Sequence, residues 1–288
     1  MKVSRRTLLV ASLALASGAA GCAILEAKES EWIFRPTRED WRGFAGASAE
    51  FTERYLPVGK GGEQIHTWWL QHPDRNAPAI LYLHGARWNL TGSVYRIHRW
   101  RDMGFSVLAI DYRGFGKSSG SAPTETLAYE DARIAWEHLK TLVPNAKQRF
   151  LYGHSLGGAV AVQIATELAE RQEAAGGLIL ESTFTSIRDL TTAYGYGWVP
   201  VGLVQTQRFE SLEKIERVKL PLLLLHGTAD RVIPHHMSEA LHARAHAREP
   251  GRKKLVIIEG GGHSNLSWNG GPIYTEAVRQ FVAQSLAL

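Results

Sequence analysis

The stretch Gly153-His154-Ser155-Leu156-Gly157-Gly158 follows the apolar run Arg149–Tyr152 and precedes a segment rich in alanine and valine. This order matches the pattern G-x-S-x-G at a sharp turn between a strand and a helix. The residues two positions before and after the serine must be small for such a turn to pack, and both are glycines. The turn exposes the serine hydroxyl, and the N-terminus of the following helix favours a developing negative charge. The stretch therefore predicts that Ser155 is a nucleophile.

Apolar runs and helical patterns alternate along the chain on both sides of this turn. Such alternation is typical of a mostly parallel sheet with helices on both faces, so we expect an α/β fold with eight strands. Residues 183–219 are long for a connection and rich in aromatic residues, which favours a small helical insertion that forms either a lid or plain surface packing. The predicted strands are Phe51–Val58, Ile65–Gln71, Ala79–Leu83, Ser106–Ile110, Arg149–Tyr152, Leu178–Leu180, Leu220–Leu225 and Leu255–Ile258, and the predicted helices are Thr126–Leu142, Ser155–Glu173, Pro234–Ala247 and Ile273–Leu286.

A serine hydroxyl needs a base to remove its proton and an acid to orient that base. With this turn, the acid and the histidine follow the serine in that order along the chain. The run ending at Leu225 leads through His-Gly-Thr-Ala to Asp230, and the run ending at Ile258 leads through Glu and three glycines to His263. Both side chains thus follow predicted strands, at the edge where open α/β sheets bind ligands. We expect Ser155, Asp230 and His263 to form a catalytic triad.

Other acids and histidines fit these roles less well. Glu181 follows its own strand and is the rival acid, but Asp230 is followed by a turn into the next helix, Arg231-Val232-Ile233-Pro234. His154 is the variable position of the turn and is interpreted as a neighbour that shapes the site. Surface or capping roles are expected for the remaining histidines of the C-terminal third: His226, His235, His236, His242 and His246.

Acyl transfer also requires hydrogen-bond donors for the developing oxyanion. The backbone N–H of Leu156, which follows the nucleophile, is the first expected donor. The second should come from the loop after the third strand, Leu83-His84-Gly85-Ala86-Arg87-Trp88. We expect the N–H of Ala86 in this role, with Arg87 as the alternative because the register is open by one residue.

The N-terminus has the composition of an export signal. A basic start precedes an apolar stretch from Thr7 to Gly21, which is short for a membrane-spanning helix of about 20 residues. Ser4–Leu9 resembles a twin-arginine export motif, and Ala19-Ala20-Gly21-Cys22 resembles a bacterial lipoprotein cleavage site. We therefore expect export to the cell envelope with a lipid anchor on Cys22; the alternative is an ordinary signal in which Cys22 is incidental.

Charge and cysteine content exclude several functions. The formal net charge of +5 includes Lys2, Arg5 and Arg6, so the rest of the chain carries about +2. No Lys/Arg-rich block of the type that binds nucleic acid is present. One cysteine cannot form an internal disulfide or a cysteine-based metal site. We expect no cofactor, no metal and no nucleic-acid partner.

With its serine turn, acid and histidine, the sequence resembles the α/β-hydrolase superfamily over nearly all of residues 50–286. Asp111-Tyr112-Arg113-Gly114-Phe115-Gly116-Lys117-Ser118-Ser119-Gly120 resembles a motif of the branch that includes serine aminopeptidase-like hydrolases, bacterial lipoprotein hydrolases, and eukaryotic membrane-associated lipases and depalmitoylases. The lead-in Ile33–Arg38 resembles the same branch. The chain then divides into an export signal (1–22), a linker and lead-in (23–48), and an α/β-hydrolase domain (49–288).

This resemblance implies a serine hydrolase that cleaves small-molecule carboxylic esters or thioesters through an acyl-enzyme at Ser155. A serine aminopeptidase-like peptidase is the alternative, for which a carboxylate that binds the substrate amine is needed; Glu181 is the only hint of one. A non-enzymatic binding scaffold is the third reading, although no triad member is missing. One fold hosts many reactions, so the substrate stays open.

Overall fold

The structure is a computed structural model that describes residues 25–44, 46, 50–120, 122–196, 198, 205–245 and 252–287. At its centre lies an eight-stranded sheet of order β1-β2-β4-β3-β5-β6-β7-β8. The β1–β2 and β2–β4 pairs are antiparallel and all other neighbours are parallel, which confirms the predicted fold class. The strands are β1 Phe51–Val58, β2 Glu63–Leu70, β3 Ala79–Leu83, β4 Ser106–Ile110, β5 Arg149–His154, β6 Gly177–Glu181, β7 Leu222–Gly227 and β8 Lys253–Ile258.

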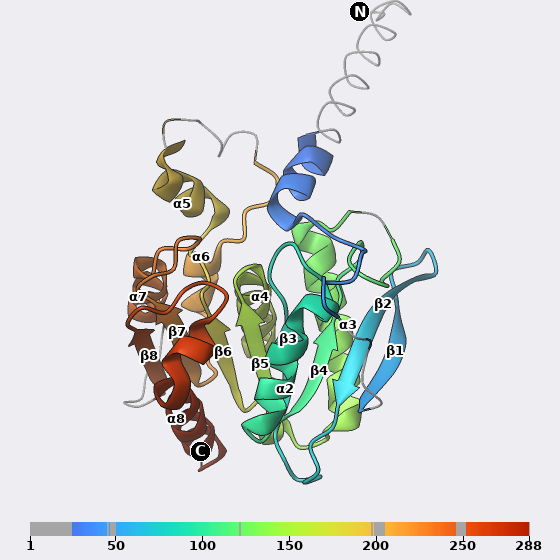
Figure 1. Cartoon of the computed structure of the whole chain (residues 1–288), viewed down its shortest axis with the longest axis vertical. Helices are drawn as coiled ribbons and strands as arrows, with labels where there is room; N and C mark the ends of the chain where they lie inside the picture. Colours follow the sequence, from blue (N-terminus) through green and yellow to red (C-terminus); the bar gives the residue numbers. More distant parts are fainter. Residues whose placement is uncertain are drawn as a thin grey trace, which may run out of the picture.

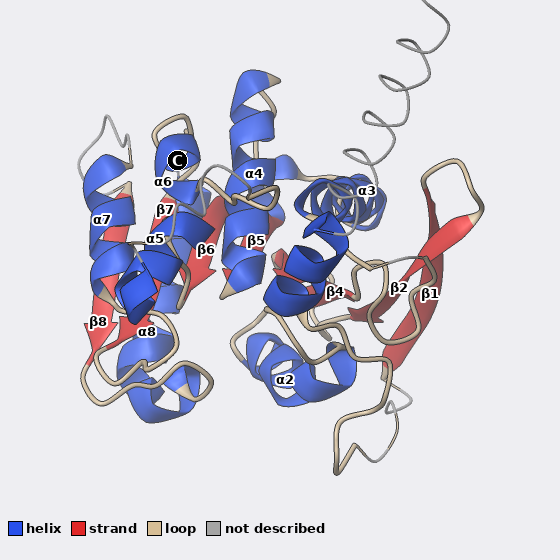
Figure 2. Ribbon diagram, turned by 90° about the horizontal axis from the view of Figure 1, so that it is seen from above, coloured by secondary structure: helices blue, strands red, loops and turns tan. Residues whose placement is uncertain are grey.

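Helices cover both faces of the sheet. Seen from above in Figure 2, α3, α4, α6 and α7 lie on one side and α2 and α8 on the other. The labelled helices are η1 Leu90–Ser93, α2 Val94–Asp102, α3 Glu125–Leu142, η2 Ala146–Gln148, α4 Leu156–Glu170, α5 Ile187–Thr191, η3 Thr192–Tyr196, α6 Ser211–Ile215, α7 His236–Arg244 and α8 Leu266–Ala287. Residues 25–34 form a further helix.

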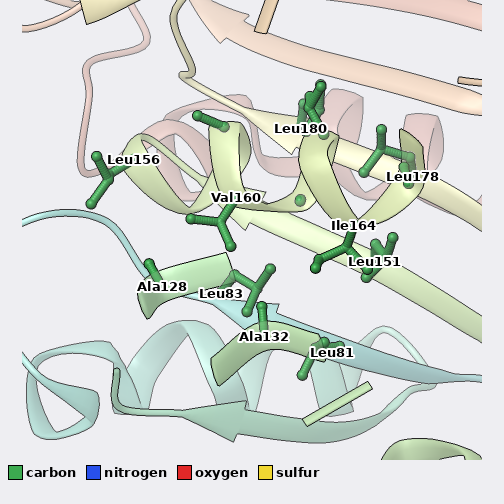
Figure 3. Packing of buried hydrophobic residues seen from close by; sticks show 14 of the residues in the cluster. Leu81, Leu83, Ala128, Ala132, Leu151, Leu156, Val160, Ile164, Leu178 and Leu180 are labelled. Atoms are coloured by element: carbon green, nitrogen blue, oxygen red, sulfur yellow. The ribbon is translucent and has the colours of Figure 1, made fainter. Parts of the chain in front are cut away.

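The core has two halves because successive strand residues point to opposite faces of the sheet. On β3, Leu81 and Leu83 join the cluster that contains α3 and α4, whereas Ile80 and Tyr82 join the cluster that contains α2 and α8. Figure 3 shows the first half, in which Val160 of α4 lies close to Leu83. β3 and β4 are buried at every position, and so their sequences are almost continuously apolar.

Two helical segments lie over the carboxyl end of the sheet (Figure 1): the helix of residues 25–34, and α5 with η3. Phe34 is fully buried, and its ring packs 5.8 Å from that of Phe209. The hydroxyl of Tyr194 on η3 donates to the carbonyl oxygen of Val232 at 2.5 Å. Residues 183–219 therefore include the predicted small helical insertion, and it is tied to the loop that carries Asp230.

Some elements differ from the sequence-based expectation. α8 begins at Leu266 rather than at the predicted Ile273, because two helical pieces adjoin across Gly271, whose φ is 42°. α2 was not predicted; it carries three arginines in nine residues, which obscures its apolar face. The export signal and Cys22 lie outside the described residues. Within the described ranges, no helix combines the length and apolarity needed to cross a bilayer.

Candidate active site

Ser155 lies in a strained turn between β5 and α4. Its φ of 56° and ψ of −122° place a residue with a side chain in a region that favours glycine. A Cβ atom at Gly153 would overlap the carbonyl oxygen of Gly157, and one at Gly157 would overlap the carbonyl oxygen of Leu83. Only glycine fits at either position. The surrounding backbone thus holds Ser155 in its strained conformation at the carboxyl end of the sheet.

The structure brings the three predicted triad side chains together. The Ser155 hydroxyl lies 3.1 Å from His263 Nε2, and His263 Nδ1 lies 2.8 Å from Asp230 Oδ2. The first distance fits a bond donated by the hydroxyl, and the second a bond donated by the imidazole. The two loops that carry the acid and the base are also joined, since Ala229 N–H donates to Gly261 O and Gly260 N–H to the Thr228 hydroxyl.

The Asp230 carboxylate is fully buried and surrounded by donors. Burial on its own raises the pKa of this carboxyl, but hydrogen bonds from His226, His263 and the backbone of Ile233 hold the pKa well below its ordinary value. Its Oδ1 accepts from the N–H groups of Val232 and Ile233, both at 2.8 Å. Asp230 is therefore ionised whenever the protein is folded near neutral pH, as an orienting acid must be.

His226 corrects the sequence-based expectation of a surface or capping role. Its side chain is fully buried, and its Nε2 lies 2.9 Å from Ile233 O and 3.2 Å from Asp230 Oδ2. Both neighbours are acceptors, so Nε2 carries the proton, and Nδ1 accepts from the Ser238 hydroxyl at 2.7 Å. His226 thus supports the acid from beneath. Its position at the end of an apolar strand was the available signal.

His154 supports the base. Burial, followed by the nearby charge of Arg96, lowers its pKa well below the ordinary value, so the ring is neutral. Its Nε2 lies 2.9 Å from the backbone oxygen of His263 and donates to it. The next carbonyl, that of Ser264, accepts from Arg96 Nη2 at 2.6 Å and from the Tyr95 hydroxyl at 2.5 Å. The backbone around His263 is therefore fixed by side chains of β5 and α2.

Glu181, the rival acid, lies away from His263 and from the two cavities. It is buried, and it accepts hydrogen bonds from the hydroxyls of Tyr152 and Tyr274 at 2.9 and 2.6 Å. Its backbone oxygen accepts from the N–H of Ser155. Glu181 does not contact His263, and it lines neither of the cavities beside Ser155. Its place in the fold is under the nucleophile turn.

Two backbone N–H groups beside Ser155 are candidates to donate hydrogen bonds to an oxyanion. Leu156 is the first residue of α4, so its N–H has no helical carbonyl to bond. Ala86 lines both cavities together with Ser155. The alternative donor, Arg87, is already engaged, because its N–H donates to the carbonyl oxygen of Phe34 at 2.7 Å. The geometry thus favours Leu156 and Ala86 over Arg87.

Ser155 lies where two cavities meet. The smaller has a volume of about 220 Å³, extends under the insertion and is lined mainly by apolar side chains, including Leu156, Phe184, Ile187, Leu190 and Ile233. The larger has a volume of about 940 Å³ and is lined by polar and aromatic side chains, including Trp41, Trp88, Tyr95, His98 and His263. No aspartate or glutamate of the described residues lines either cavity. No group of three or more His, Cys, Asp or Glu side chains within the described ranges is placed to hold a metal ion.

The motif Asp111–Gly120 has a structural role. Asp111 Oδ1 accepts from the N–H of Leu90, and its Oδ2 lies 3.1 Å from His66 Nδ1. The Arg113 guanidinium binds the buried Asp131 at 2.7 Å. Through these contacts Asp111 and Arg113 fix their loop by hydrogen bonds.

The profile of the family described as serine aminopeptidase, S33, matches residues 74–211 and 201–267. The chain belongs to the serine aminopeptidase S33 family. This S33 chain is 32% identical over 242 residues to an uncharacterised protein of Mycobacterium tuberculosis, covering 81% of this chain and 82% of that one. It is 30% identical over 190 residues to the lysophosphatidylserine lipase ABHD12 of Danio rerio, covering 61% of this chain and 49% of the lipase. The chain thus spans about half the length of that lipase.

Solved structures agree with the fold of this S33 family member. The Pyrococcus furiosus esterase Pf2001 superposes with a TM-score of 0.65 at 18% identity, covering 87% of this chain and 99% of the esterase. The predicted resemblance to the α/β-hydrolase superfamily is confirmed, and the family and its relatives support a hydrolase.

Proposed function

We propose that the protein is a serine hydrolase that cleaves carboxylic esters or thioesters through an acyl-enzyme at Ser155. One observation carries this proposal: the hydrogen-bonded chain from Ser155 through His263 to the buried Asp230 stands where two cavities meet. A hydroxyl with an imidazole acceptor that is itself oriented by a carboxylate is the arrangement of an activated nucleophile.

The proposed reaction has two stages. Ser155 Oγ attacks the acyl carbon while His263 Nε2 takes the hydroxyl proton, and the N–H groups of Leu156 and Ala86 stabilise the oxyanion. His263 then gives the proton to the leaving alcohol or thiol, which departs and leaves an ester between Ser155 and the acyl group. Water, deprotonated by His263, attacks the acyl carbon; the bond to Ser155 Oγ breaks, His263 returns the proton to Oγ, and the carboxylic acid leaves. Asp230 holds His263 in the required tautomer throughout.

We assign the two sides of the substrate to the two cavities. The apolar cavity under α5 and η3 suits an acyl chain, and the larger, more polar cavity suits the leaving group. The relative named lysophosphatidylserine lipase supports a single-chain acyl lipid as the small-molecule substrate class. Anchoring of the exported protein through a lipid on Cys22 belongs to the same proposal.

The peptidase alternative has less support. An aminopeptidase that recognises a free substrate amine needs a carboxylate in its binding site, and in the described part of the chain no carboxylate lines either cavity. Glu181, the one candidate from the sequence, is held by two tyrosine hydroxyls beneath the turn. An ester or thioester substrate makes no such demand.

A hydrolysis panel on the purified full-length chain tests the proposal. It compares p-nitrophenyl esters of increasing acyl length, acyl-thioesters and aminoacyl-nitroanilides, each with Ser155→Ala as the control. We expect ester or thioester turnover that Ser155→Ala abolishes. Turnover of aminoacyl-nitroanilides alone would establish the peptidase, and a folded protein inactive on every substrate would favour the binding scaffold.

A further inference from the structure

Exposed aromatic side chains surround the openings of the two cavities. We call five of them the aromatic rim: Trp32, Trp41, Trp88, Tyr95 and Tyr194. Each lines one of the cavities, and yet each is between 42% and 63% exposed. Trp41 and Trp88 pack edge to face with ring centroids 4.2 Å apart. Surfaces of soluble proteins rarely leave so many large apolar rings together, and such patches mark interaction sites.

The rim comes from separate parts of the chain. Trp32 lies on the helix of residues 25–34, Trp41 follows that helix, Trp88 lies in the loop after β3, and Tyr194 lies on η3. Tyr196 and Trp198, beyond Tyr194, extend the exposed aromatic surface without lining either cavity. Rings from distant segments thus converge around a site that an acyl chain must enter.

The charged side chains that line the two cavities are all cationic. Among the described residues, those that line the cavities and carry a full charge near neutral pH are Arg35, Arg87 and Arg96. Arg35 and Arg87 are exposed, and neither forms a salt bridge within the described part of the chain. Both have a positive φ, 48° and 72°, and the Arg87 N–H donates to Phe34 O beside Arg35. The fold accepts backbone strain where it presents these two cations.

The place where the N-terminal segment joins the domain also favours a lipid surface at this end of the sheet. The apolar stretch Thr7–Gly21 precedes the helix of residues 25–34 by a few residues in sequence. That helix lies at the carboxyl end of the sheet, on the same end as α5 (Figure 1). A membrane attachment through the N-terminal segment therefore brings this end of the domain, and not the opposite one, to the bilayer.

We propose that the aromatic rim docks on an anionic lipid surface. Tryptophan and tyrosine favour the interface between headgroups and acyl chains, and arginines beside them are attracted to the phosphates of anionic lipids. In this orientation Trp32 and Tyr194, the exposed aromatic residues that line the apolar cavity, face the bilayer. An acyl chain then passes from the lipid to Ser155 without crossing water. Docking is a binding event and does not depend on the proposed chemistry.

A fluorescent probe on the face tests docking separately from anchoring. In a full-length Cys22→Ser background, an environment-sensitive fluorophore is attached at Ala193→Cys on η3 or, as the control, at Leu142→Cys at the C-terminal end of α3, which leads to the opposite end of the sheet. Vesicles contain phosphatidylcholine alone or mixed with phosphatidylglycerol, with and without a nitroxide-labelled lipid as quencher. Sedimentation measures how much of each protein is vesicle-bound.

We expect the probe at residue 193 to shift to shorter wavelength and to be quenched by the nitroxide lipid, more strongly on anionic vesicles, while the probe at residue 142 stays unchanged. Ser155→Ala should give the same shift, because no turnover is involved. The pair Arg35→Gln and Arg87→Gln should remove the preference for anionic vesicles. Tyr196→Ser with Trp198→Ser should reduce the shift and leave hydrolysis of a soluble short-chain ester unchanged.

Three results would overturn the proposal. The first is a probe at residue 193 that keeps its solution spectrum on vesicle-bound protein. The second is an equal response of both probes, which indicates attachment without a preferred face. The third is a shift that depends on protein concentration without vesicles, which indicates that a second copy of the chain covers the rim.

Discussion

Gly157→Ala tests whether the nucleophile turn depends on the close backbone approach that the structure shows. A Cβ atom at this position would meet the carbonyl oxygens of Leu83 and His84 closer than 3.0 Å, and both are backbone atoms that cannot rotate away. The turn or the end of β3 must therefore move. Overpacking of this kind costs about 1–3 kcal/mol of unfolding free energy. Misplacement of the reacting groups by roughly 1 Å costs about 10²-fold in rate.

The matched control is Gly61→Ala. Its φ is not in the left-handed region, and an added Cβ atom would meet nothing within 4 Å. Denaturant unfolding gives the stability of each variant, and kcat/KM on a short-chain ester gives the activity. We expect Gly157→Ala to lose both while Gly61→Ala retains both. A stable and fully active Gly157→Ala would show that the backbone does not approach this position as closely as 3.0 Å.

Three further predictions concern the side chains around the triad. His226→Ala leaves Ile233 O and the Ser238 hydroxyl without a partner and weakens the support of Asp230. It should therefore lower the unfolding free energy, measured by denaturant titration, by about 2–4 kcal/mol. Ser238→Ala alone should lower it by less. His154→Leu removes the donor to His263 O and should lower kcat roughly fivefold, whereas His154→Gln retains a donor and should recover part of the lost kcat. Because His154 is neutral, the midpoint of the pH–rate profile should not move in either variant. Asp230→Asn should lower kcat by roughly 10³–10⁴-fold. The pKa of Asp230 in the folded protein lies below the unfolded value of about 3.9, so its contribution to stability is complete above about pH 5 and is lost as pH falls below 4. The difference in unfolding free energy between wild type and Asp230→Asn should therefore be constant near neutral pH and should become smaller in acid.

The fold could be predicted because its signals are local. Short apolar runs bounded by turn residues marked β3 to β8, and most of these strands are buried at every position. The nucleophile turn was equally plain, because its two glycines are required by backbone contacts within a few residues of Ser155. Asp230 and His263 followed from their place after two such strands.

The surroundings of the site could not be predicted, because they depend on contacts between distant segments. His226 was expected in a surface or capping role, but it is buried between partners on the following loop and on α7. The choice between Ala86 and Arg87 required the contact with Phe34, more than 50 residues earlier in the chain. The aromatic rim likewise joins Trp32 to Tyr194 across most of the sequence, and no local pattern marks it.

The most direct test of the proposed chemistry is labelling of the full-length protein with a fluorophosphonate, which reacts only with an activated serine. Peptide mapping by mass spectrometry locates the adduct, and His263→Ala and Ser155→Ala serve as comparisons. We predict a single adduct on Ser155 that forms far more slowly in His263→Ala and is absent from Ser155→Ala. A folded protein that carries no adduct on Ser155, or that hydrolyses esters at the full rate after Ser155→Ala, would contradict the assignment of Ser155 as the nucleophile.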